Sequence, residues 1–223
     1  MKRLVSGSII EIYVKEINHY IYVKYIDIRK LIKDVSYPFQ FRIHRDFLGE
    51  PVIDVDNLNF LYLLISPLHL TGFKELIKTD EWKIVGIQTL TEYDKKQHHY
   101  KKAWPPSLIA MFDNVKQWRV LKDINNVNKG EIVPYFRCAH LEYAENLGAS
   151  HLAFRVIIEY WKSKAEKIDL DKSLWNKFDY VLFSRYINMP LYAVVPDKFK
   201  GKLIPESYTD AFSWLQDIHR VGG

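Results

Sequence analysis

The densest group of titratable side chains lies between residues 138 and 145, where Cys138, His140, Glu142 and Glu145 follow one another closely. Thiols, imidazoles and carboxylates are the groups that perform nucleophilic and acid–base catalysis. On a helix, however, His140 and Glu145 are five residues apart and do not share one face. We therefore interpret residues 139–147 as a short helix with a solvated acidic side that ends at Gly148, and Cys138 as an inert thiol.

Other arrangements that could bind a metal or a cofactor are also weak. The adjacent His98 and His99 point to opposite faces of a strand, and no further ligand stands at a supporting spacing. Asp54 and Asp56 could hold a cation, but a turn before Asn57 explains them as well. The chain has no glycine-rich phosphate loop, nucleophile elbow, His-Glu-x-x-His or Cys-x-x-Cys motif. We expect a protein without metal or cofactor that is not an enzyme, unless folding assembles a site from distant residues.

Positive charge is concentrated in one segment. The chain has a formal net charge of +5, yet residues 95–122 contain seven basic residues and one acidic residue, a net charge of +6, so the rest sums to −1. Aromatic and histidine side chains alternate with these lysines, as phosphate contacts and base stacking require. A solvated loop is the other interpretation. The candidate partner-binding residues are Lys95, Lys96, His98, His99, Tyr100, Lys101, Lys102 and Trp104.

Hydrophobic periodicity predicts strands in the first half of the chain. Residues 8–14 and 20–27 alternate apolar and polar side chains, which indicates a half-buried β-hairpin. Shorter segments with strand character follow at 39–43, 59–65, 81–87, 117–121 and 131–133, and a helical turn is expected between 71 and 77.

The second half of the chain has helical periodicity. Ser150 is a good N-cap for a helix over residues 151–167, in which Arg155 and Glu159 are spaced for an ion pair. Two further helices are expected after Ser173 and Ser207. The fold class is therefore α+β, with an N-terminal antiparallel, curved or barrel-like sheet and C-terminal helices packed on it. A turn-rich stretch at 125–130 places the boundary between a β-rich region 1–135 and a mainly helical region 136–223, unless the two form one continuous domain.

Composition favours a globular protein inside the cell. Of 223 residues, 48% are hydrophobic and 26% are charged, which is ordinary for a folded domain. The longest apolar run, residues 60–65, is far shorter than the roughly 20 residues that span a bilayer. The start of the chain alternates like a strand rather than forming a secretory apolar segment, and the single cysteine forms no internal disulfide. We expect a cytoplasmic protein that does not contact a membrane.

Three segments of the β-rich region resemble a known family. The opening Gly7-Ser8-Ile9-Ile10-Glu11-Ile12, the strand Tyr20-Ile21-Tyr22-Val23 and the segment Trp82-Lys83-Ile84-Val85-Gly86 are similar to the immunity protein 26 family of bacterial polymorphic toxin systems. Ser8 stands where that family usually has Asp, and Tyr13 and Val14 continue the strand where proline is common.

The resemblance implies a bacterial, non-enzymatic immunity protein that binds and neutralises a cognate protein toxin. Such a function agrees with an aromatic content of 15%, because interfaces are enriched in Tyr and Trp. The alternative function is a nucleic-acid-binding module that uses the basic aromatic segment 95–122.

Overall fold

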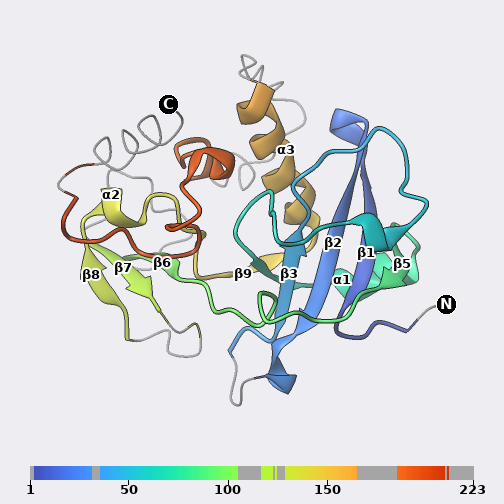
Figure 1. Ribbon diagram of the computed structural model, residues 1–223, viewed down its shortest axis with the longest axis horizontal. Helices are drawn as coiled ribbons and strands as arrows, with labels where there is room; N and C mark the ends of the chain where they lie inside the picture. Colours follow the sequence, from blue (N-terminus) through green and yellow to red (C-terminus); the bar gives the residue numbers. More distant parts are fainter. Residues whose placement is uncertain are drawn as a thin grey trace. The chain divides into compact units, whose positions relative to one another are not determined.

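The computed structural model describes residues 3–31, 36–104, 117–122, 124, 129–164, 185–208 and 210. They form two β-sheets and a few helices, which confirms the predicted α+β class (Figure 1). The chain divides into two compact units, one of residues 1–96 with 145–160 and the other of residues 97–144 with 161–223. The division into regions 1–135 and 136–223 stays a prediction.

The first unit contains a six-stranded sheet with the order β5-β1-β2-β3-β4-β9. The strands are β1 (Ser8–Val14), β2 (His19–Asp27), β3 (Phe39–Ile43), β4 (Leu68–Thr71), β5 (Trp82–Ile87) and β9 (Asn146–Gly148). Neighbouring strands are antiparallel except β4 and β9, which are parallel. The sheet is therefore mixed rather than wholly antiparallel. Within the described residues it stays open, with β5 and β9 at its edges, and does not close as a barrel would.

Both faces of the central strands are covered. The predicted hairpin of β1 and β2 forms, but Ile9, Ile10, Tyr22 and Val23 are all fully buried, so it is not half-exposed as the alternation suggested. On one face, Phe73 of helix α1 (Phe73–Lys78) packs against Tyr25 of β2 and Phe41 of β3. Phe41 in turn packs against Trp82 of β5. The opposite face carries Tyr22, Lys24 and Arg42, beneath segments that follow β3 and β5.

One predicted strand, residues 59–65, is a series of turns instead. The side chain of Asn59 accepts a hydrogen bond from the Leu61 backbone N–H at 2.9 Å, a local bond that favours a turn over a strand. The run still buries Phe60, Leu63 and Ile65, while Leu61 and Tyr62 are about half exposed. The strand that pairs with β3 in the sheet is instead β4, which was not predicted from the sequence.

The predicted helix after residue 150 is confirmed as α3 (Ser150–Lys164). Its Arg155 Nη1 lies 3.0 Å from Glu159 Oε2, which is the expected i,i+4 ion pair, and both side chains are buried. The helix predicted after Ser173 lies outside the described residues, as does almost all of the one expected after Ser207. In the part of the chain that is described, no helix is both long and apolar enough to cross a membrane.

The second unit contains a three-stranded antiparallel sheet of β6 (Tyr100–Trp104), β7 (Gln117–Leu121) and β8 (Glu131–Val133), followed by helix α2 (Tyr135–Cys138) and the short 3-10 helix Tyr192–Val194. The helix expected over residues 139–147 is wrong. The Lys101 N–H donates to the Glu142 carbonyl and the Lys101 carbonyl accepts from the Ala144 N–H, both at 2.8 Å, so the chain around Tyr143 pairs with β6. Residues 146 and 147 belong to β9 of the first unit's sheet.

Candidate functional site

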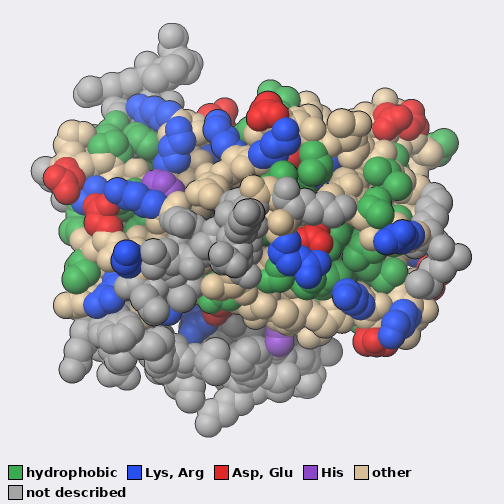
Figure 2. All heavy atoms as spheres, turned by 90° about the horizontal axis from the view of Figure 1, so that it is seen from below, with side chains coloured by type: hydrophobic (Ala, Val, Ile, Leu, Met, Phe, Trp, Pro, Cys, Tyr) green, Lys and Arg blue, Asp and Glu red, His purple; other side chains and the backbone are tan. Residues whose placement is uncertain are grey.

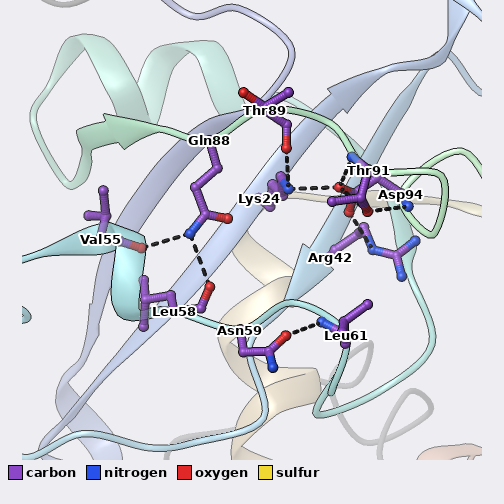
Figure 3. Close-up of polar contacts among 10 residues, drawn as sticks. All are labelled: Lys24, Arg42, Val55, Leu58, Asn59, Leu61, Gln88, Thr89, Thr91 and Asp94. Atoms are coloured by element: carbon purple, nitrogen blue, oxygen red, sulfur yellow. Dashed lines mark hydrogen bonds and ion pairs between the residues drawn. The ribbon is translucent and has the colours of Figure 1, made fainter.

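A buried cluster of three charges lies on one face of the first unit's sheet (Figure 3). Lys24 of β2 and Arg42 of β3 are directly opposite each other, and like charges in that position repel. Asp94, from the loop after β5, lies between them: its Oδ2 is 2.7 Å from Lys24 Nζ and its Oδ1 is 3.4 Å from Arg42 Nε. All three side chains are at most 3% exposed. The cluster thus links two strands to a loop distant in sequence.

Asp94 is held as an anion by several donors. The Thr91 N–H and hydroxyl donate to Asp94 Oδ2 at 2.9 and 3.0 Å. Burial by itself raises the pKa of Asp94, but the hydrogen bonds from Lys24 and Thr91 and the charges of Lys24 and Arg42 outweigh it and lower that pKa. Lys24 Nζ also donates to the Thr89 carbonyl at 3.3 Å. These contacts indicate that Asp94 has a structural role and does not act as a general acid or base.

Beside this cluster is a hollow of about 700 Å³, which Lys24 and Asp94 help to line. Its other walls combine apolar and polar side chains, namely Leu58, Phe60, Leu61, Ile87, Asp56 and Gln88. A second hollow of about 460 Å³ is lined by Val52, Ile53, Asp80, Trp82, Ile84 and Val85, among others. The hollows therefore involve successive parts of the same two segments, one around residues 52–61 and the other around β5.

Three contacts attach the first of these segments to the sheet. The Val52 N–H donates to the Tyr22 hydroxyl at 2.6 Å, and that hydroxyl donates to Glu11 Oε2 at 2.7 Å. Gln88 Nε2 donates to the carbonyls of Val55 and Leu58 at 2.7 and 3.0 Å (Figure 3). These bonds fix both ends of the 3-10 helix η3 (Val55–Asn57).

Gly86 of β5 allows a fourth contact, in which Val55 of η3 packs against this strand. A Cβ atom at this position would lie 2.3 Å from Val55 Cγ2, so any larger residue would force Val55 of η3 or the strand itself to shift. The Asp54 carboxylate caps η3 by accepting from the Asp56 N–H at 3.0 Å. We call residues 52–62 together with residues 80–88 the η3–β5 surface.

The η3–β5 surface exposes large hydrophobic side chains. The exposed fractions are 104% for Ile53, 52% for Leu61, 51% for Tyr62 and 57% for Ile87. Ile53 lines the smaller hollow, whereas Leu61 and Ile87 line the larger one. Hydrophobic side chains gathered around hollows are typical of surfaces that bind another molecule.

The residues predicted from the sequence to bind a partner do not form one exposed group. Lys95 and Lys96 are exposed in the first unit, where Lys95 Nζ lies 2.5 Å from Glu92 Oε1. In the second unit His98, Tyr100 and Lys101 are buried. His99 and Lys102 are partly buried, and Trp104 is the last residue of β6.

Lys101 shows why the interpretation as a solvated loop is wrong for this part of the segment. Its Nζ donates to the Ala139 carbonyl at 2.6 Å and lies 4.7 Å from the centre of the Tyr143 ring and 5.5 Å from that of Tyr135. The ammonium of Lys101 is fully buried, and these rings and the carbonyl offset the cost of removing it from water. Lys101 therefore cannot reach a phosphate or a protein partner from this position. Figure 2 shows one face of the molecule, on which basic side chains are interspersed with acidic and hydrophobic ones.

Of the titratable group around Cys138, the side chains of Cys138, His140 and Glu142 are buried and that of Glu145 is partly buried. Burial raises the pKa of the Cys138 thiol to about 12. Burial lowers the pKa of His140 to about 4, and its Nε2 lies 2.8 Å from the Lys202 carbonyl. The neutral imidazole thus donates to a backbone carbonyl, and the thiol stays protonated at neutral pH. Among the residues that the structure describes, no group of three or more His, Cys, Asp or Glu side chains could hold a metal ion.

Sequence reasoning missed the η3–β5 surface and the charge cluster beside it. One signal was present: residues 46–73 contain Asp46, Glu50, Asp54 and Asp56 but no Lys or Arg, a net charge of −4 in a chain of net charge +5. Comparisons of the chain with models of protein families, with curated proteins and with solved structures gave no match.

Proposed function

We propose that this protein is a cytoplasmic, bacterial immunity-type protein that binds a cognate protein toxin and neutralises it without catalysis. The observation that carries the proposal is the η3–β5 surface, which exposes four large hydrophobic side chains, three of which line two hollows. Protein interfaces use such side chains as anchors that insert into a partner or receive one.

The resemblance to the immunity protein 26 family supports the proposal in a second way. The three segments that carry it belong to β1, β2 and β5, which are neighbours in the sheet. Gly7, the glycine of the opening motif, has a φ of 93°, and a Cβ there would lie 2.2 Å from the Gln88 carbonyl oxygen. The Gln88 N–H donates to the Gly7 carbonyl at 2.9 Å. The motif glycine thus positions the residue that holds η3.

The η3–β5 surface is also organised before any partner arrives. Tyr22 and Gln88 hold the backbone at Val52, Val55 and Leu58 through hydrogen bonds. A surface whose loop is already fixed loses little conformational entropy on binding, and this favours affinity. A stoichiometric inhibitor needs such affinity, because it must occupy the toxin whenever the toxin is present.

The test is to express the product of the gene adjacent to this chain's gene, with and without this chain, in bacterial cells. We expect the neighbouring product to stop growth, and this chain to restore growth and to co-purify with it. Ile87→Arg should abolish protection. Ile132→Arg is the matched control, because both isoleucines lie on strands and are 57% and 58% exposed, and it should leave protection intact. Growth arrest that the unchanged chain does not relieve would contradict the proposal.

A further inference from the structure

The charge of the η3–β5 surface indicates what kind of partner it fits. It carries Asp54, Asp56, Asp80 and Glu81 against the single base Lys83, a net charge of −3, and all five side chains are exposed. The whole chain has a net charge of +5, so this surface has the opposite sign to the protein that carries it. The acidity is therefore a local property of the η3–β5 surface.

These carboxylates differ from other exposed acids of the protein. Glu75, Glu92 and Asp197 each form an ion pair with a lysine three residues further on, at 2.5 to 2.7 Å. Within the described parts of the chain, Asp54, Asp56 and Asp80 form no ion pair. Their charge is not cancelled locally, so it is available to attract cations of a partner.

Each hollow combines an exposed carboxylate with an exposed hydrophobic side chain. Asp56 shares the larger hollow with Leu61 and Ile87, and Asp80 shares the smaller one with Ile53. Lys24, which lines the larger hollow, has its charge engaged by Asp94. A complementary face would therefore place apolar side chains in the hollows and basic side chains against the carboxylates around them.

We infer that the η3–β5 surface docks on a basic face of a partner protein, one with apolar or aromatic side chains among its lysines and arginines. The inference rests on the proposed function, and it narrows the class of toxin. Enzymes that act on nucleic acids hold phosphates with such basic faces. The toxin that fits is one that acts on a nucleic acid, and this protein covers the face that receives the substrate.

The first experiment measures association with the toxin from the adjacent gene at several salt concentrations. The variant is the triple substitution Asp54→Asn, Asp56→Asn and Asp80→Asn. Asn keeps the shape, caps η3 as Asp54 does, and tolerates the positive φ of 62° at residue 80. We expect the association rate of the unchanged chain to fall with salt, and that of the triple variant to be about tenfold lower at low salt and less dependent on salt.

Glu16→Gln is the control for this experiment. Glu16 is exposed and lies in the 3-10 helix between β1 and β2, away from the residues that line either hollow. It should leave both the rate and its salt dependence unchanged. A complex whose formation depends neither on salt nor on the three carboxylates would overturn the inference while leaving the proposed function intact.

The second experiment does not need the toxin. The isotope-labelled full chain is titrated with a short peptide of alternating Arg and Trp, and separately with its Glu and Trp counterpart, and backbone amide chemical shifts are followed. We expect the basic peptide to shift resonances of residues 52–62 and 80–88, and the triple variant to bind it about threefold more weakly. Equal binding of both peptides, shifts confined to other residues, or no shifts at all would overturn the inference.

Discussion

At the scale of single residues, the most costly arrangement is the pair of buried cations on β2 and β3. Lys24 and Arg42 lie opposite each other away from water, where an unpaired charge is strongly unfavourable. Asp94 offsets both charges and accepts a hydrogen bond from the Thr91 N–H, while Lys24 donates to the Thr89 carbonyl. These contacts join the loop after β5 to the centre of the sheet. The carboxylate of Asp94 therefore determines whether the cations of Lys24 and Arg42 can remain buried.

Asp94→Asn should destabilise the protein by about 3 kcal/mol, because it removes the negative charge that lies between two buried cations. Asp46→Asn is the control, since Asp46 is 52% exposed and pairs with an exposed Arg45, and it should cost less than about 1 kcal/mol. Urea unfolding followed by fluorescence gives both free energies of unfolding. Similar small decreases in the free energy of unfolding of the two variants would show that Asp94 does not stabilise the buried cations.

At the scale of elements, half of the η3–β5 surface is a loop, residues 52–62, which hydrogen bonds hold against the sheet. Tyr22 and Gln88 hold the loop's backbone, and Gly86 leaves the space that Val55 occupies. A rigid sheet thus positions a non-repetitive segment, as is common where loops carry binding residues.

Gly86→Ala should weaken binding of the proposed partner and destabilise the fold by about 1 to 3 kcal/mol, because its methyl group would overlap Val55 of η3. Gly49→Ala is a matched control, since a Cβ there meets nothing within 4 Å. We expect it to change the free energy of unfolding by less than about 0.5 kcal/mol. Binding affinity and thermal unfolding of the two variants, measured side by side, check the prediction. Equal affinity and equal stability of the two variants would contradict it.

Elements with a local signal could be predicted from the sequence, and those fixed by distant partners could not. The alternation in β1, β2 and β5 and the cap at Ser150 predict those elements correctly. Residues 59–65 are a continuous apolar run that predicts a buried strand, but the Asn59 side chain favours a turn there. Strand β6 could not be predicted because its lysines indicate an exposed loop. Lys101 is buried only because the rings of Tyr135 and Tyr143, which come from later in the sequence, lie around it. The candidate site escaped prediction for the same reason, since exposure and pairing depend on the folded chain.

At the scale of the whole molecule, both units contain histidines that are buried in the neutral form. Burial lowers the pKa of His69 in the first unit and of His140 in the second to about 4, although each imidazole contacts a backbone carbonyl. In the unfolded chain these groups titrate near 6.5. Between these values the unfolded state binds more protons than the folded state, so acid favours unfolding of both units.

The free energy of unfolding should therefore be highest above about pH 6.5 and decrease as the pH falls toward 4. Below about pH 4 the lowered pKa of Asp94 adds a further loss, because its stabilising charge is present above the unfolded-state pKa and disappears as the carboxylate is protonated. His69→Gln should reduce the slope between pH 6.5 and 4. Urea unfolding at a series of pH values checks the slope, and a flat profile would contradict the prediction.

The parallel pairing of β4 with β9 has a consequence for synthesis on the ribosome. The chain leaves the first unit after residue 96 and returns at residue 145, so 48 residues of the second unit (97–144) are made before the sixth strand exists. At ordinary ribosomal elongation rates this interval lasts about 2 to 10 s. During that time the nascent sheet has β4 as an unpaired edge, which is where a chaperone or a premature contact between growing chains would act.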